Sequence, residues 1–185
     1  MFAAAALAFG VVFLAEIGDK SQLLVLSLAG RFRRLPVLLG VSTAVLLIQG
    51  LSVVAGSFIA DRVPKRPVEI VAGLLFLGFA AWSLRSSDET AHEVAPSQRS
   101  AYLTSAVAFL AAEFGDKTML ATAALAARGD RLGTWVGSSA AMIASAAIAV
   151  LVGGALARRI KPQVLRYAAA AAFVIVGSLL LLGVG

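Results

Sequence analysis

Apolar residues run along this chain in long stretches that short polar breaks interrupt. A helix that crosses a membrane needs about 20 consecutive apolar residues. Six segments reach or approach that length, namely 2–28, 36–60, 68–84, 101–127, 133–157 and 164–180. The pattern therefore predicts an all-α integral membrane protein with six transmembrane helices, of which the third is the shortest.

The two halves of the chain repeat one another. A constant offset of 97 positions carries Glu16 onto Glu113, Arg34 onto Arg131 and Gly40 onto Gly137. We expect a first repeat of three helices at 1–84, a polar cytoplasmic linker at 85–98 and a second repeat at 99–185. Because three is an odd number, the second repeat enters the membrane from the opposite side. The halves are thus predicted to be inverted repeats, an architecture common among transporters.

Composition supports a protein that lies almost wholly in the membrane. Of the 185 residues, 60% are hydrophobic and 14% are charged, whereas soluble domains have about 25% charged residues. No room remains for a soluble catalytic domain. Cysteine is absent and His92 is the single histidine, which argues against thiolate or imidazole metal sites. The apolar N-terminal run lacks a basic leader, so it is predicted to be a first membrane helix.

The basic residues give the chain a net charge of +6 and lie mainly in short breaks between apolar segments. This placement is the usual signal of membrane orientation, not of nucleic-acid binding. One side carries nine Lys and Arg residues, including Arg31, Arg33 and Arg34, and the other carries five, including Arg62 and Arg131. We expect the linker inside the cell and both termini outside the cytoplasm. The excess of Arg over Lys favours a bacterial plasma membrane.

A charged motif occurs twice within these apolar segments. Both copies read Glu-x-Gly-Asp-Lys-(Ser/Thr), at residues 16–21 and 113–118. A charge at membrane depth costs about 2.5–3.5 kcal/mol even on the milder insertion scale, so six of them cost roughly 15–20 kcal/mol. On a continuous helix the Glu, Asp and Lys would share one face. The glycine weakens the helix and is expected to act as a hinge that exposes backbone carbonyls.

Two such motifs together predict a cation site. The candidate ligands are four carboxylates, and hydroxyls, lysines and hinge glycines support them. The predicted ligands are Glu16, Asp19, Glu113 and Asp116, and the supporting residues are Gly18, Lys20, Ser21, Gly115, Lys117 and Thr118. An all-oxygen site suits Ca²⁺, Mn²⁺ or Mg²⁺. Each motif carries a net charge of −1, so the pair matches one divalent ion, and protons would replace that ion when it leaves.

Three further residues are candidates for lining the cation path. Gln22 and Met119 follow the two motifs directly, and Gln49 lies mid-membrane in the second segment. A thioether at Met119 would favour Mn²⁺ slightly over Ca²⁺, although ordinary helix packing also explains it. For Gln49 the alternative is a hydrogen bond between helices.

Other function classes stay open from the residues alone. The motifs are also compatible with a structural ion-pair cluster or a small cation channel. A metal-dependent membrane enzyme such as a lipid pyrophosphate phosphatase would need phosphate-binding cations beyond Lys20 and Lys117. An exporter of a small organic cation would fit the size of the chain and the acidic residues. We expect no enzymatic activity and no cofactor other than the transported ion and protons.

The paired motifs resemble those of a known family. Two intact copies, each in the first helix of a three-helix repeat, are the signature of the GDT family of Ca²⁺/Mn²⁺ transporters, and the resemblance covers essentially the whole chain. It implies export of a divalent cation in exchange for protons. It also implies that Glu16, Asp19, Glu113 and Asp116 are the cation ligands, with the lipid bilayer and the metal ion as partners.

Overall fold

A computed structural model describes residues 1–17, 19–85, 101–128, 130–156 and 162–183. All of its regular structure is helical, with no strand among the described residues. The eight helices are α1 (Phe2–Glu16), α2 (Lys20–Arg31), α3 (Arg34–Ala60), α4 (Lys65–Arg85), α5 (Ala101–Glu113), α6 (Lys117–Ala126), α7 (Arg131–Leu156) and α8 (Pro162–Leu182). The all-α prediction is confirmed, whereas the linker predicted at 85–98 lies outside the described residues except at its first position.

The first predicted helix of each repeat is divided in two at the motif. Segment 2–28 becomes α1 and α2, whose axes bend by 71°, and segment 101–127 becomes α5 and α6. In the second break Gly115 has φ +79°, a conformation that favours glycine. The hinge expected there is therefore present, while Gly18 lies outside the described residues.

These breaks correct the expectation that Glu, Asp and Lys share one helical face. Glu16 is the last residue of α1, Asp19 precedes the first turn of α2, and Lys20 begins that helix. Asp19 has extended backbone angles, φ −85° and ψ 171°. Because the chain turns between the glutamate and the lysine, the two side chains belong to different helices.

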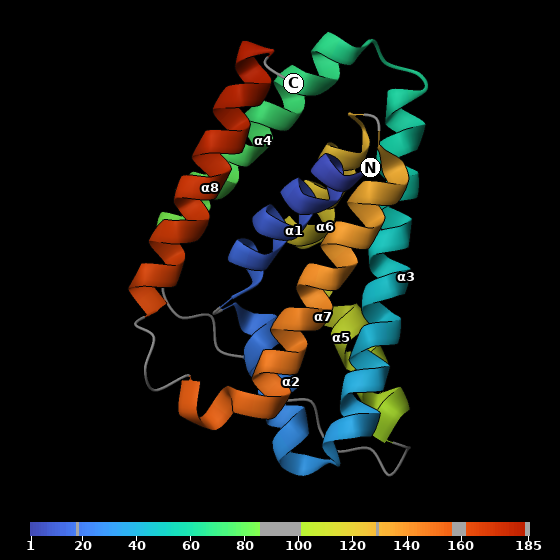
Figure 1. The fold of residues 1–185 in the computed structure, drawn as a ribbon, viewed down its shortest axis with the longest axis vertical. Helices are drawn as coiled ribbons and strands as arrows, with labels where there is room; N and C mark the ends of the chain where they lie inside the picture. Colours follow the sequence, from blue (N-terminus) through green and yellow to red (C-terminus); the bar gives the residue numbers. More distant parts are fainter. Residues whose placement is uncertain (18, 86–100, 129, 157–161, 184–185) are drawn as a thin grey trace.

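The helix bounds repeat with the offset of 97 positions. Helices α2, α3 and α4 begin at residues 20, 34 and 65, and α6, α7 and α8 begin at 117, 131 and 162. Figure 1 shows equivalent helices running in opposite directions: α1 and α2 descend from the N-terminus while α5 and α6 climb, and α3 climbs while α7 descends. The long-range contacts follow the same pattern, since α3 packs on α5 and α7 packs on α1.

Two equivalent glycines allow these helix pairs to approach closely. A Cβ atom added at Gly40 in α3 would overlap the carbonyl oxygen of Tyr102 in α5. One added at Gly137 in α7 would overlap the carbonyl oxygen of Ala5 in α1. The same offset relates both partners of the two contacts. Small residues of this kind let membrane helices pack backbone against backbone.

Apolar packing holds the motifs inside the helix bundle. One buried cluster includes Val12, Val45 and Phe109, and a second is centred on Phe76 and Phe173, whose rings lie 5.8 Å apart. By length and composition, α3 and α7 can each cross a membrane, and α1 with α2 makes a third span if the bent pair is counted as one. The six-span arrangement stays a prediction.

Candidate functional site

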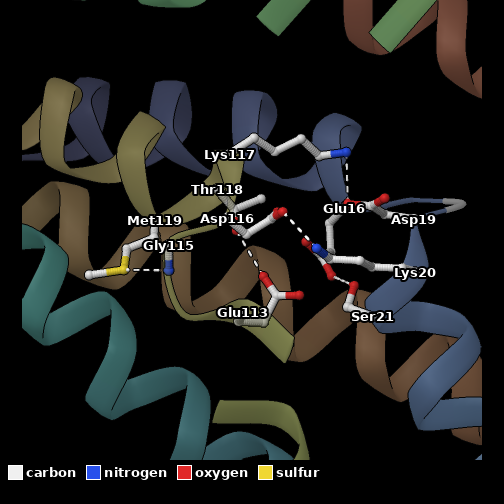
Figure 2. Close-up of polar contacts among 10 residues, drawn as sticks. All are labelled: Glu16, Asp19, Lys20, Ser21, Glu113, Gly115, Asp116, Lys117, Thr118 and Met119. Atoms are coloured by element: carbon white, nitrogen blue, oxygen red, sulfur yellow. Dashed lines mark hydrogen bonds and ion pairs between the residues drawn. The ribbon is translucent and has the colours of Figure 1, made fainter. Parts of the chain in front are cut away.

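The two motifs meet at the helix breaks and pair crosswise. The ammonium of Lys20 lies 3.1 Å from Asp116 Oδ1, and that of Lys117 lies 2.7 Å from Asp19 Oδ2. Each lysine thus contacts the aspartate of the other repeat, as Figure 2 shows. Asp116 is 6% exposed at its side chain, and Asp19 and Lys117 are each 19% exposed. The motifs therefore form one electrostatic unit, although they lie far apart in the sequence.

The two glutamates lie beside this unit and are more deeply buried. Glu16 is 2% exposed and Glu113 is 1% exposed. Ser21 donates a hydrogen bond to the Glu16 carboxylate, and Thr118 Oγ1 donates one to Glu113 Oε2 at 3.0 Å. The hydroxyl in the last position of each motif thus donates to the glutamate of its own motif, a bond that either Ser or Thr can make.

Several buried carboxylate oxygens of the motifs accept no hydrogen bond from the described residues. Glu16 Oε2, Glu113 Oε1 and Asp116 Oδ2 are buried and have no hydrogen-bond partner among the described residues. A buried acceptor without a partner costs about 1–3 kcal/mol. Native proteins keep such atoms where a ligand, ion or water can satisfy them.

The four motif acids, all of them within the described residues, are not gathered into a metal-binding cluster. Among the described residues, no three acidic or imidazole side chains lie close enough together to hold a metal ion. Each of the two aspartates instead contacts a lysine of the other repeat.

The three candidate path residues have different surroundings. Gln22 Nε2 donates to Ser145 Oγ of α7 at 3.2 Å. Gln49 is fully buried, and its Nε2 lies 2.9 Å from Met142 Sδ, so the hydrogen bond between helices expected for Gln49 is present. Met119 turns its sulfur toward the Gly115 N–H, 3.4 Å away, and away from the carboxylates (Figure 2).

Sequence reasoning did not single out Glu69, a buried acid near the start of α4. Its side chain is 7% exposed and lies 3.5 Å from Arg66 Nη1. The available signal was an acidic residue inside the predicted third helix, three positions after an arginine. The structure places this pair near the end of α8, where Arg66 also donates to backbone carbonyls.

Interrupted helices that bring charged motifs together inside an apolar bundle are typical of secondary membrane transporters. The chain belongs to the family of the divalent cation/proton antiporter GDT1, whose model matches residues 4–91 and 101–184. The two matched segments correspond to the two repeats of the chain. The protein is therefore a membrane protein of a cation/proton antiporter family, as the paired motifs indicated.

Similarity to curated proteins supports this family assignment. A Vibrio cholerae protein named "Putative manganese exporter" is 34% identical over 92% of this chain and 86% of its own length. The Arabidopsis thaliana "Protein PAM71-homolog, chloroplastic" is 30% identical over 96% of this chain, which spans 58% of that relative. The Arabidopsis "GDT1-like protein 5" is 27% identical over 90% of each chain. No solved structure matches the chain.

Proposed function

We propose that this protein exports a divalent cation, Mn²⁺ in preference to Ca²⁺, in exchange for protons. The observation that carries the proposal is the crossed pairing of Lys20 with Asp116 and of Lys117 with Asp19. This pairing gathers buried charge from both repeats at one place inside an apolar bundle. Preference for Mn²⁺ draws on the name of the Vibrio cholerae relative.

In the proposed mechanism the four acids of the two motifs bind the cation. Glu16, Asp19, Glu113 and Asp116 supply oxygen ligands of the kind that Mn²⁺ and Ca²⁺ accept. As the ion enters, Lys20 and Lys117 leave the aspartates. Four carboxylates and two ammonium groups sum to −2, so one divalent ion neutralises the site. Two protons do the same when the ion has left, which makes the exchange electrically balanced.

The remaining motif residues have supporting roles in this mechanism. Ser21 and Thr118 orient the glutamates through their hydroxyls. Gly115, with φ +79°, allows the backbone to turn between α5 and α6, and Gly18 is proposed for the equivalent role in the first motif. Gln22, Gln49 and Met119 would line the route on either side of the site, with Met119 reaching the ion only after its sulfur leaves the Gly115 N–H.

The same proposal includes the membrane arrangement. The chain would cross a bacterial plasma membrane six times as inverted repeats at 1–84 and 99–185, joined by a cytoplasmic linker at 85–98. Both ends would face away from the cytoplasm. Three observations support this arrangement: the repeating helix bounds, the opposite courses of equivalent helices (Figure 1) and the uneven distribution of Lys and Arg.

Uptake of Mn²⁺ and Ca²⁺ into proteoliposomes, with and without an imposed pH gradient, tests the proposal. We expect flux that depends on the gradient, is faster for Mn²⁺, and disappears in Glu113→Gln. Arg33→Gln, which changes an exposed charge outside the motifs, serves as the matched control and should transport normally. Flux that ignores pH and follows voltage would instead indicate a channel, and the absence of flux from folded protein would contradict metal transport.

A further inference from the structure

The two repeats are tied together at one end of the bundle. This upper end in Figure 1 is where α3 and α8 finish and where α4 and α7 begin. Asp61, directly after α3, pairs with Arg131, the first residue of α7. The Met1 amino group pairs with Asp130, and hydrogen bonds from that group and from the Gly133 N–H lower the pKa of Asp130 below its usual value.

A second tie at the upper end joins α4 to α8. Arg66 Nη1 lies 3.3 Å from the Leu180 carbonyl oxygen, and Nη2 lies 2.6 Å from that of Leu181. The last carbonyls of a helix have no partner within it, so a cation there is favourable. The buried Glu69 carboxylate, 3.5 Å from Arg66 Nη1, helps to hold the guanidinium in place.

The sequence does not repeat these charges at the positions that the offset relates to them. The offset of 97 positions carries Asp61 onto Arg158 and Arg131 onto Arg34. It also carries Glu69 onto Arg166. An ion pair between the repeats at the upper end therefore corresponds, in the sequence alone, to two arginines. Opposite charges attract and like charges repel, so the positions that the offset relates to Asp61 and Arg131 cannot form the same attractive pair.

From this asymmetry we infer that the Asp61–Arg131 pair and the Arg66 contacts act as a latch that keeps the upper end closed. Transporters of inverted repeats work by moving one repeat against the other around a fixed site. Contacts made in only one of two such states shift the population toward that state. Without substrate, the protein is then more often closed at the upper end and open at the lower end.

The direction of opening gives the latch its role, and this role rests on the proposed function. With the proposed orientation the upper end faces away from the cytoplasm. The latched protein would therefore open its site toward the cytoplasm, where an exporter loads its cation. The charge pairs would favour cation loading from the cytoplasm and disfavour outward opening of the empty site. Both effects are what an exporter needs.

Thiol labelling tests the latch directly, because the chain contains no cysteine. Thr122→Cys in α6 reports on the interior between the motif and the upper end, and Ser105→Cys in α5 reports on the lower half. Both residues are fully buried. Each reporter is combined with Asp61→Arg, with Asp61→Arg plus Arg131→Asp, or with Arg62→Gln. Arg62 contacts Phe58 in its own repeat and serves as the control.

The rates of reaction with a maleimide are measured in detergent, without metal. Arg131 and Asp61 are 49% and 59% exposed at their side chains, and an exposed pair shifts an equilibrium by roughly two- to fivefold. We expect Asp61→Arg to speed labelling of Thr122→Cys by this factor and to slow that of Ser105→Cys.

The charge swap, Asp61→Arg with Arg131→Asp, should restore both rates, and Arg62→Gln should leave them unchanged. Unchanged rates after Asp61→Arg would overturn the latch. So would rates that rise together at both reporters and are not restored by the swap. Labelling needs neither ion flux nor a pH gradient. The latch can therefore be refuted while the proposed transport function holds, and the transport function can be refuted while the latch holds.

Discussion

The crossed lysine–aspartate pairs make a quantitative prediction for Lys117→Met. Lys117 and Asp19 are 2.7 Å apart, and each side chain is 19% exposed. Exposed pairs contribute about 0.2–1 kcal/mol, whereas removing one partner of a buried pair costs about 3–5 kcal/mol. For a mostly buried pair we expect a loss of about 2 kcal/mol, between these two limits, because the substitution leaves the Asp19 carboxylate without its partner.

The thermal unfolding midpoint in detergent, followed by tryptophan fluorescence, measures this loss. For a chain of this size about 2 kcal/mol lowers the midpoint by about 4–8 °C. Adding Asp19→Asn to Lys117→Met should recover part of the loss, with a coupling of at least about 1 kcal/mol. Arg33→Met, at an exposed position, should change stability by less than about 0.5 kcal/mol. If the losses from Asp19→Asn and Lys117→Met simply add, the two side chains do not interact and the crossed arrangement is wrong.

Two further predictions concern packing and the buried glutamates. Gly137→Leu should abolish stable folded protein in detergent, because the added Cβ would overlap the Ala5 carbonyl oxygen. Gly10→Leu should be tolerated, since nothing lies within 4 Å of a Cβ added there. Equal yields of the two variants by size-exclusion chromatography would contradict this prediction. Thr118→Val keeps the shape of the side chain and removes the hydroxyl that donates to Glu113. The thermal unfolding midpoint should therefore fall by an amount equivalent to about 1–3 kcal/mol. An unchanged midpoint would mean that this hydrogen bond contributes nothing to stability.

Much of the fold could be predicted because apolar length and internal repetition are direct signals in the sequence. The offset that relates Gly40 to Gly137 in the sequence also relates their packing contacts. The hinge at Gly115 was predictable, since a glycine between charged residues weakens a helix. What the sequence did not reveal is the angle of the bend, because a bend depends on the helices that pack around it.

The pairing within the site depends on tertiary contacts and was beyond reach of the sequence. Spacing along one helix favours Glu16 and Lys20 as neighbours, but the turn between them sends Lys20 to Asp116 in the other repeat. The pairing of Glu69 with Arg66 has a local signal in their i,i+3 spacing, but the contacts of Arg66 with α8, more than a hundred residues away along the chain, do not. The sequence made Met119 a candidate for lining the cation path, and only the structure shows that its sulfur accepts a hydrogen bond from the Gly115 N–H.

The central claim is that two motifs build one cation site, and counting bound Mn²⁺ tests it most directly. Electron paramagnetic resonance of purified protein titrated with Mn²⁺ reports the number of ions bound per chain. We predict one ion per chain, with binding lost in Glu16→Gln and equally in Glu113→Gln, because each motif supplies half of the ligands. Two ions per chain, or full binding that survives when one motif is altered, would contradict a site shared between the repeats.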